Sequence, residues 1–290
     1  MTSSVLTLDE FSRWDAVVRK TGGYDFYHTA AYHRMAERNG EGDPVMIVAE
    51  RGSDVIAFPL LVRELPTGGP FSPFSGLRDA TSVYGYPGPL CSLVDPDPAL
   101  LDYFRSAVEN FFRESKTIAA FSRFHPLFDQ SRLLAGYGKI VPAGITVSID
   151  LTLPPEVQRS RFRQDTRYGL NKLRRNGYHC EETGREAIGD FVRIYYETLN
   201  RVHAEEYYYF DRSYFERFYD DLSPASHLFG CSLDGTIIAA GLFVETGPIV
   251  QYHLSGTLDR YMPPGPMRLI LDTVRLWATG RGARVLHLGG

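Results

Sequence analysis

The sequence has few of the features that mark secreted, membrane-spanning or disulfide-stabilised proteins. Its 290 residues contain only three cysteines, an odd and widely spaced set that fits free thiols in a reducing cytoplasm. No run of about 18 apolar residues predicts a membrane span. The first residues carry no basic region followed by an apolar one, so no secretory signal is expected. These absences predict a cytoplasmic protein.

The familiar catalytic motifs are missing as well. The sequence contains no HExxH, CxxC, GxSxG or Walker motif, and no GxGxxG motif follows a predicted strand. Its eight histidines are dispersed, which argues against a metal site. We therefore expect no metal and no cofactor, and the function has to be inferred from charge, repeats and less specific motifs.

The composition is that of a well-packed globular protein. A hydrophobic content of 43% is enough for one large or two medium domains, and an aromatic content of 13% favours aromatic-lined clefts. The net charge of -4 argues against a protein that coats nucleic acid, although it permits a local contact with RNA phosphates.

The two halves of the sequence repeat each other with a constant offset of 182 positions. The matched residues are Phe26-Tyr27 with Tyr208-Tyr209, Tyr32 with Tyr214, Ile56-Ala57 with Ile238-Ala239, and Leu60 with Leu242. One offset shared by a helix and a hairpin is improbable by chance. We therefore predict an α/β (α+β) protein of two similar domains, residues 1–145 and 146–290, related by internal duplication.

Hydrophobic periodicity and turn residues place the elements within each half. The first half predicts helices at 8–20, within 24–40 and at 99–114, a hairpin at 44–62, and strands at 82–91 and 118–124. The second half predicts a helix after the aromatic residues 207–210, a hairpin at 226–245, strands at 249–257 and 284–290, and a helix at 266–280. A Gly- and Pro-rich loop at 64–80 is long enough to suggest a binding or lid role.

A basic segment, residues 159–175, lies just past the middle of the chain. Seven of its residues are Arg or Lys, and Asp165 is its one acid. Pro154-Pro155 before it and Gly177 after it indicate a single helix. At about 100° per residue, Phe162, Thr166, Leu170 and Leu173 share one stripe, and Arg159, Arg163, Arg167 and Arg174 share a neighbouring face. This pattern is typical either of a solvated helix face or of a helix that binds an anionic ligand such as phosphate. The repeat places it at the start of the second domain, at the edge of an expected interdomain cleft.

Six segments together suggest a family. FYHTAAYHRM, SVYGYPGPL, FSRFHPL, RYGLNKLRRNGY, YHLSGT and RVLHLGG occur in an order that resembles the FemXAB family, whose fold is two tandem GNAT-like (acyl-CoA N-acyltransferase-like) domains. The resemblance covers nearly the whole chain. It implies transfer of an amino acid from aminoacyl-tRNA, the donor substrate, to an amine, classically on a peptidoglycan precursor, without a further cofactor.

The resemblance also implies that the basic segment contacts tRNA, and the loop before the last helix bears on whether coenzyme A could bind instead. The residues expected to contact tRNA are Arg159, Arg163, Arg167, Lys172, Arg174 and Arg175. Neither half contains the [RQ]xxGx[GA] loop that binds the pyrophosphate of coenzyme A in acetyltransferases. The nearest segment, Pro263-Pro264-Gly265-Pro266, has prolines where backbone N–H donors would be needed.

Three residues are candidates for the chemistry of aminolysis. His125 stands at the position of the aspartate in a segment like Arg-Ile-Asp-Pro that cell-wall members of the family carry. The resemblance therefore implies that an imidazole, with an ordinary pKa of about 6.5, replaces a carboxylate and accepts a proton from the amine. The alternative is that His125 only hydrogen-bonds the loop after its strand. Tyr252 and Ser255 lie on the strand at 249–257, where alternation predicts opposite faces. Ser255 or the nearby backbone would donate to the oxyanion, and ordinary core contacts are the alternative.

The expected substrate-binding residues are mostly aromatic. They are Tyr84, Tyr86, Arg123, Tyr207, Tyr208 and Tyr209. Cell-wall members carry phosphate-contacting side chains near the last three, whereas an aromatic wall suits a ring or a peptide. We therefore expect a peptide or peptide-like acceptor of natural-product biosynthesis rather than a nucleotide-linked precursor. The alanyl-tRNA-dependent step that completes pacidamycin-type uridyl peptide antibiotics is an analogous reaction.

Two other functions remain open from the sequence. One is an acyl-CoA-dependent N-acyltransferase, and the other is a catalytically inactive GNAT-like module that binds RNA or a partner. Members of the family continue past the last strand with a segment that contains Phe-Lys, whereas this sequence stops at Gly289-Gly290. Either another cation takes the role of that lysine or the sequence is incomplete.

Reversing Arg163, Arg167 and Arg174 to Glu is expected to weaken the use of charged tRNA and to flatten its salt dependence, because each phosphate contact releases counterions. The free energy of unfolding should change little, since surface substitutions usually cost little. Binding of labelled tRNA across a salt series checks this prediction. Affinity equal to that of the wild type would leave the segment as a solvated face.

Overall fold

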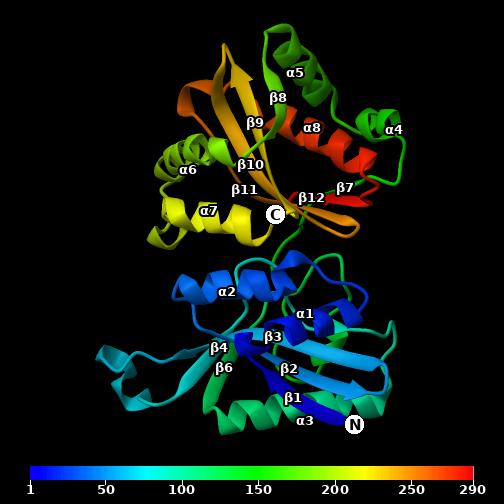
Figure 1. Cartoon of the computed structure of the whole chain (residues 1–290), viewed down its shortest axis with the longest axis vertical. Helices are drawn as coiled ribbons and strands as arrows, with labels where there is room; N and C mark the ends of the chain where they lie inside the picture. The colour runs from blue at the N-terminus through cyan, green and yellow to red at the C-terminus, as the bar shows by residue number, and fades with distance from the viewer. Residues whose placement is uncertain (290) are drawn as a thin grey trace. The chain divides into compact units, whose positions relative to one another are not determined.

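The computed structural model describes residues 1–289, except for the side chains of residues 71 and 72 (Figure 1). The chain divides into two compact units, Met1–Ala143 and Gly144–Gly290. The boundary expected from the sequence, between residues 145 and 146, lies two positions further along the chain. Each unit contains one sheet with helices on both of its faces.

Unit 1 is built around one mixed sheet with the order β1-β2-β3-β4-β6, and β5 also pairs with β3. Its strands are β1 (Thr2–Leu6), β2 (Asp43–Arg51), β3 (Asp54–Glu64), β4 (Arg78–Thr81), β5 (Leu90–Cys91) and β6 (Thr117–Phe121). Its helices are α1 (Phe11–Lys20), α2 (Ala30–Arg38) and α3 (Pro98–Glu114), with short 3-10 turns that include η2 (Phe26–His28) and η3 (Gly69–Phe74). In the described sheet of unit 1, only β4 and β6 are parallel neighbours.

The central hairpin of unit 1 is apolar on both faces, which explains its position between two helix layers. Met46 and Val48 of β2 pack into the core that contains α1, whereas Ile47 and Ala49 pack into the core that contains α3. Successive side chains of a strand point to opposite faces, so a continuous apolar run predicts burial on both.

Unit 2 has the sheet order β7-β12-β11-β10-β9-β8. Its strands are β7 (Ser148–Asp150), β8 (His179–Thr183), β9 (Ser226–Leu233), β10 (Thr236–Thr246), β11 (Ile249–Thr257) and β12 (Val285–His287). Its helices are α4 (Pro155–Ser160), α5 (Gln164–Arg175), α6 (Ile188–Val202), α7 (Arg212–Asp221) and α8 (Met267–Gly280), and η6 (Glu206–Tyr208) precedes α7. Figure 1 shows α5 and α8 on one side of the sheet and α6 and α7 on the other.

The internal repeat is present in the structure. β3 and β10 begin and end 182 positions apart, at residues 54 and 64 and at residues 236 and 246. The strand order β1-β2-β3-β4-β6 of unit 1 corresponds to β8-β9-β10-β11-β12 of unit 2, and the last two strands are parallel in both. The predicted fold class, two similar mixed α/β domains, is therefore confirmed.

Several elements differ from those predicted. The expected strand at 82–91 is irregular except for β5, because Gly85 and Gly88 have positive φ and Pro87 and Pro89 lack an N–H. The strands β1, β4, β7 and β8 and the helix α6 are absent from the sequence-based prediction, and β4 begins within the segment 64–80 that was expected to be a loop. No helix within residues 1–289 is long and apolar enough to cross a membrane.

The predicted single basic helix is in fact two helices. α4 ends at Ser160 and α5 begins at Gln164, and Arg163 between them has extended backbone angles, with φ -56° and ψ 151°. Leu170 and Leu173 of α5 are buried against the core of unit 2, as the apolar stripe predicts. Arg159 therefore does not share a continuous helix with Arg167 and Arg174.

Gly256 is expected to be essential for the packing of β11 against α6. A Cβ at this position would lie 2.7 Å from the carbonyl oxygen of Ile194 and 2.9 Å from Thr198 Oγ1. Gly256→Ala should therefore lower the free energy of unfolding by about 2 kcal/mol, the usual cost of overpacking. Urea unfolding of the full chain measures it.

Gly280→Ala, at the end of α8, is the matched control, since a Cβ there would meet nothing within 4 Å. This variant should be neutral or slightly more stable, because Ala favours helices more than Gly. Equal stability of the two variants would contradict the packing argument.

Candidate functional site

The first group of site residues surrounds the parallel strand pair of unit 1. β4 and β6 pair from Arg78 and Thr117 to Thr81 and Phe121. Ser82 N then donates one further bond to Phe121 O at 3.0 Å. Beyond this point the chains separate, because the Gly- and Pro-containing segment 83–89 cannot continue a strand. The predicted residues of this unit follow the point of separation.

His125 is buried, and both of its ring nitrogens are engaged. Leu127 N donates to Nδ1 at 3.2 Å, which leaves the ring proton on Nε2, and Nε2 donates it to Asp25 Oδ2 at 2.9 Å. The bond from Leu127 matches the alternative in which His125 holds the loop after its strand. To accept a proton from an amine, His125 would first have to release one of these contacts. Its role as a base stays a prediction.

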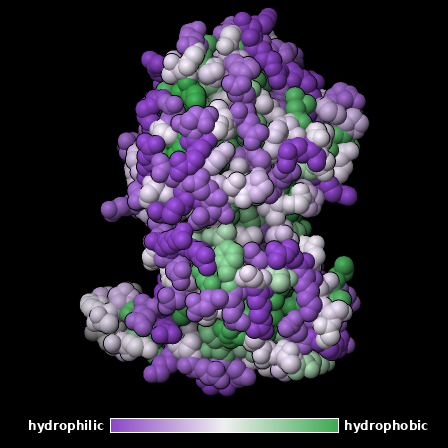
Figure 2. Space-filling view, in the orientation of Figure 1, coloured by the Kyte–Doolittle hydropathy of each residue, from purple (hydrophilic) through white to green (hydrophobic). Residues whose placement is uncertain are grey.

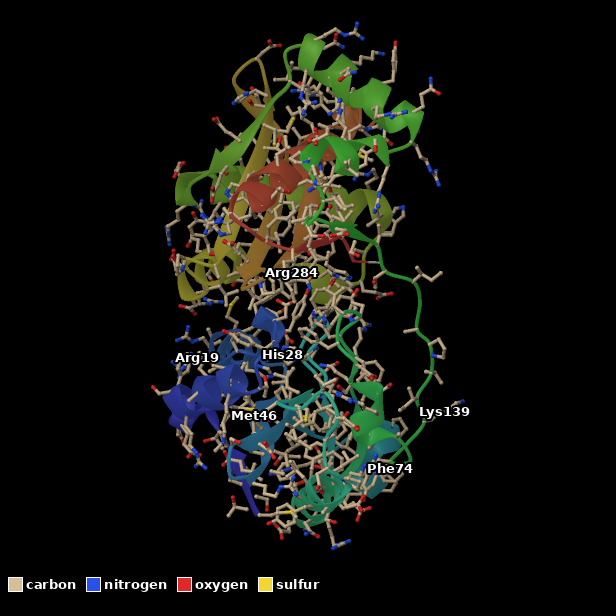
Figure 3. The ribbon with its side chains drawn as sticks, turned by 90° about the vertical axis from the view of Figure 1, so that its right-hand side faces the viewer. Arg19, His28, Met46, Phe74, Lys139 and Arg284 are labelled. Atoms are coloured by element: carbon tan, nitrogen blue, oxygen red, sulfur yellow. The ribbon has the colours of Figure 1, made fainter. Side chains whose placement is uncertain are left out.

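Asp25 and His28 are buried polar residues that the sequence analysis missed. Asp25 is the N-cap of η2, where its Oδ1 accepts from Phe26 N at 2.7 Å and its own N donates to His28 Nδ1 at 3.1 Å. Figure 3 shows the labelled His28 within unit 1. The available signal was Asp followed three residues later by His just before a helix, a capping box in which His replaces the usual Glu or Gln.

Tyr27 lies at the centre of the predicted aromatic residues of unit 1. Its ring centroid is 5.9 Å from that of Tyr86 and 6.5 Å from that of His125. A Cβ on Gly85 would lie 2.2 Å from Tyr27 Cε1, so only glycine fits here. Burial, reinforced by the charge of Asp25, raises the pKa of Tyr27 well above its ordinary value, and its phenol stays protonated at neutral pH.

The two remaining predicted residues of unit 1 join the same cluster. The backbone oxygen of Tyr84 accepts from the Tyr32 hydroxyl at 3.1 Å, and Arg123 N donates to Ser82 Oγ at 3.3 Å. The exposed Arg123 is close enough to Tyr27 to act against the rise of its pKa. The structure thus brings Tyr84, Tyr86, Arg123 and His125 together.

The second group of site residues lies on β11, which contains a β-bulge. Leu254 pairs with Leu242 and Tyr252 pairs with Phe243, so β11 has one extra residue, His253, between these pairs. An extra residue reverses the alternation of side chains beyond it. The ring of His253 stacks on that of Phe218 of α7, with centroids 4.8 Å apart.

Because of the bulge, Tyr252 and Ser255 point to the same face of the sheet. Their hydroxyls are hydrogen-bonded to each other, and Tyr252 packs against the core that contains α5 and α8. The prediction that they lie on opposite faces is therefore wrong. Burial raises the pKa of Tyr252, so the pair offers one hydroxyl proton as a donor at neutral pH.

A buried amide and imidazole mark the point where the parallel strands of unit 2 separate. Gln251 of β11 and His287 of β12 are the last paired residues, and Gln251 Oε1 lies 2.7 Å from His287 Nδ1. Both side chains are fully buried. No local pattern of the sequence indicated this pair. Within residues 1–289, no three His, Cys, Asp or Glu side chains group as metal ligands.

The predicted aromatic wall of unit 2 belongs to η6 and lies beside α6. Tyr208 O accepts from the Tyr195 hydroxyl at 3.1 Å, and the Tyr209 hydroxyl donates to Asn200 Oδ1 at 2.8 Å. Tyr207 is 48% exposed and Tyr209 is 37% exposed. Since α6 and α8 cover opposite faces of the sheet, the structure does not bring this wall together with Tyr252 and Ser255.

The basic segment is held by a buried carboxylate. Asp272 of α8 accepts from Arg174 Nη2 at 2.6 Å, from Arg159 Nη1 at 3.3 Å and from Arg275 Nη2 at 2.7 Å. The hydrogen bonds of Arg174 and Arg275 lower the pKa of Asp272 against the opposing effect of burial. Arg174→Glu would place two carboxylates together, so the expectation that the triple reversal spares stability is wrong for this residue.

The other basic residues of the segment form no ion pair in the described part of the chain. They are Arg161, Arg163, Arg167, Lys172 and Arg175. The surface over α5 is largely hydrophilic (Figure 2). Five positive charges of the segment thus lie outside ion pairs of the described chain, with Asp165 as the one acid among them, and two arginines are held in place beside them.

The segment 263–266, just before α8, has no backbone donor to offer. Pro263, Pro264 and Pro266 lack an N–H, and Gly265 N donates to Met262 O at 3.0 Å. A pyrophosphate could not be bound by these backbone groups.

Two buried histidines are expected to destabilise unit 1 in acid. Burial lowers the pKa of His28 to about 3 and that of His33 to about 4, whereas the ordinary value is 6.5. Below about pH 6.5 the unfolded chain binds protons that the folded chain does not, so stability falls as the pH falls. Each histidine should lower the free energy of unfolding by about 2 kcal/mol when the pH falls from about 7 to about 5.

Urea unfolding at these two pH values measures the loss. His28→Gln should reduce the pH-dependent loss by about 2 kcal/mol, whatever its effect at neutral pH. His179→Gln, which replaces an exposed histidine, should leave the loss unchanged. The same pH dependence in the wild type and in His28→Gln would contradict the prediction.

Comparison with known proteins supports the fold. Residues 160–290 match the family of acetyltransferase (GNAT) domains. No curated protein matches the sequence. The chain is similar to the crystal structure of FemX, with a TM-score of 0.76 and 15% identity over 100% of this chain and 89% of that one.

Two further solved structures are similar to this chain. L-PGS from Bacillus licheniformis has a TM-score of 0.60 and 15% identity over 96% of this chain and 75% of that one. A tandem GNAT protein from the clavulanic acid biosynthesis pathway has a TM-score of 0.50 and 13% identity over 100% of this chain and 89% of that one. The chain therefore has a fold of two tandem GNAT-like domains.

Proposed function

We propose that the protein is an aminoacyltransferase that uses aminoacyl-tRNA as the donor and forms a peptide bond on the amine of a peptide or peptide-like acceptor. The coarser inference, a transferase of the acyltransferase type, rests on the tandem GNAT-like fold and on the GNAT family match over residues 160–290. The choice of donor rests on the chemistry of unit 2.

The observation that carries the choice of donor is the loop at 263–266. Its three prolines and its internally bonded Gly265 leave no N–H for the pyrophosphate of an acyl-CoA. The same unit carries five cations without an ion-pair contact in the described chain, two between α4 and α5 and three on α5, which suit the phosphates of RNA. Both features favour a polynucleotide donor over coenzyme A.

The reaction is the aminolysis of an ester. The amine nitrogen attacks the aminoacyl carbonyl carbon, the new C–N bond forms, and the C–O bond to the ribose breaks. The proton lost by the amine ends on the ribose hydroxyl. The ester is already activated, so positioning and stabilisation of the oxyanion supply most of the acceleration.

Unit 2 contains a hydrogen-bond donor suited to the oxyanion. The Tyr252 and Ser255 hydroxyls share one face of β11 and are bonded to each other, so one hydroxyl proton is available for an acceptor. The raised pKa of Tyr252 keeps that proton in place at neutral pH. In this proposal His125 holds the aromatic cluster of unit 1, and it acts as a base only if a substrate displaces one of its contacts.

The acceptor is proposed to bind aromatic surfaces. Tyr84 and Tyr86 surround Tyr27 in unit 1, and Tyr207 and Tyr209 are partly exposed in unit 2. These rings suit a peptide or a ring system rather than a pyrophosphate. Alanine as the transferred amino acid, a cytoplasmic location and an acceptor of a natural-product pathway belong to the same proposal, and a cell-wall precursor is the alternative acceptor.

An acyl-CoA-dependent N-acyltransferase is the second candidate. Two observations favour it: the acetyltransferase (GNAT) family match and the similarity to the tandem GNAT protein from the clavulanic acid biosynthesis pathway, a structure described as being without AcCoA. An inactive binding module would keep the fold without transfer. Because each candidate uses a different donor or none, a donor assay separates the three.

Alanyl-tRNA with a radiolabelled alanine is expected to yield a labelled peptide product when it is incubated with the protein and short peptides that carry free amines. Acetyl-CoA should yield no product, because the protein lacks a loop that would bind its pyrophosphate. Thin-layer chromatography of the products measures both reactions.

Pretreatment of the donor with ribonuclease is the control, and it should abolish the labelled peptide. Product from acetyl-CoA alone would replace the proposal by the second candidate. The absence of product with both donors would favour a binding module.

A further inference from the structure

The exposed face of α5 contains an open depression. It has a volume of about 560 Å³ and is lined by Tyr168, Asn171, Arg174 and Arg175. These residues are three, three and one positions apart, so the helix places them on adjoining parts of one face. Figure 3 shows many side chains with terminal nitrogen atoms around the helices of this region.

Tyr168 does not contribute to the core of unit 2. Its side chain is 64% exposed, whereas Leu170 and Leu173 on the opposite side of the helix anchor α5. A large aromatic ring that lies in solvent between cationic side chains is typical of a platform on which a nucleobase stacks.

The wall of the depression is held in place from below. Arg174 is bound by Asp272, whose side chain is 1% exposed. Arg159 reaches from α4 to the same carboxylate, and its Nη2 donates to Asn171 Oδ1 at 2.9 Å. With its oxygen engaged, Asn171 presents its amino group as a donor. The polar groups of the depression are therefore oriented before any ligand binds.

The charge of the depression suits a phosphate. Arg175 forms no ion pair within the described residues, and neither do Arg167 and Lys172 on the same helix. Arg174 remains 40% exposed although it contacts Asp272. Three arginines surround the single carboxylate of Asp272, so the region keeps a net positive charge.

We infer that this depression binds one unpaired nucleotide of an RNA, with its base stacked on Tyr168 and its phosphate held by Arg175, Arg174 and the Asn171 amide. The inference rests on the proposed function in one respect, namely that the RNA is the donor tRNA. The depression would then bind unpaired nucleotides of the tRNA in preference to its double-helical arms. Exposed bases can stack on a ring, whereas the bases of a duplex are already stacked on each other.

Tyr168→Ala should weaken binding of a labelled single-stranded oligoribonucleotide about tenfold, the usual effect of removing one stacking partner. It should leave binding of a blunt RNA duplex of equal length unchanged. Tyr168→Phe keeps the ring and should bind both probes like the wild type. Fluorescence anisotropy at fixed ionic strength measures the six affinities of the wild type and the two variants for the two probes.

Two further variants complete the test. The slope of log affinity against log salt is negative, and Arg175→Ala should make it shallower by about one, because one phosphate contact is lost. Tyr137→Ala removes a partly exposed aromatic ring of unit 1 and should change nothing. Wild-type affinity of Tyr168→Ala for the single strand, or equal losses on single strand and duplex, would overturn the inference. Binding only to vesicles of phosphatidylglycerol would also overturn it and would point to an anionic lipid.

The outcomes are distinguishable from failure of the proposed reaction. Loss of single-strand binding in Tyr168→Ala without transfer from any charged tRNA would support the nucleotide site and contradict the aminoacyltransferase. Transfer from charged tRNA that is unaffected by Tyr168→Ala, together with unchanged oligonucleotide binding, would support the enzyme and contradict the site.

Discussion

In each unit the candidate site depends on one pair of parallel strands that stays hydrogen-bonded for only a few residues. β4 and β6 of unit 1 separate because glycine and proline follow β4. β11 and β12 of unit 2 separate after three paired residues, directly before the bulge of β11. Separated strands leave backbone and side chains that the sheet does not use, and the sites described above occur at these two places.

The two units use this shared geometry for different chemistry. Unit 1 fills the space beyond the separation with buried polar groups, in which Asp25 joins His125 and caps the turn that contains His28. Unit 2 keeps a pair of hydroxyls there and places its charges on α4 and α5 instead. Internal duplication has thus preserved the strand order while the side chains at equivalent positions have diverged.

Much of the fold could be predicted from the sequence, because it depends on local patterns. The hairpins have short turns with Gly52 and Gly235 between apolar runs, and the constant offset of β3 and β10 revealed the duplication. The break between α4 and α5 could not be predicted, since the sequence there has neither Gly nor Pro. In the structure, Asp272, about a hundred positions away, holds Arg159 and Arg174 on either side of that break.

The site was predicted less completely, for the same physical reason. His125 was identified from a local motif, but its contact with Asp25 joins residues 100 positions apart. Tyr252 and Ser255 are both candidates from the sequence, yet their common face depends on a bulge that strand alternation does not encode. Sequence patterns report which residues can do chemistry, whereas their partners depend on tertiary contacts.

The carboxylate of Asp272 has a consequence for how the surface of α5 responds to its surroundings. Dissolved salt screens exposed charges over a Debye length of about 8 Å at physiological ionic strength, but it acts much less on a partly buried ion pair. The contacts of Arg159 and Arg174 with Asp272 therefore persist in salt, while the long-range attraction of the exposed cations fades. On this helix, salt weakens the attraction of the exposed cations without releasing the arginines from Asp272. The surface can therefore stay ordered when it no longer attracts a distant polyanion.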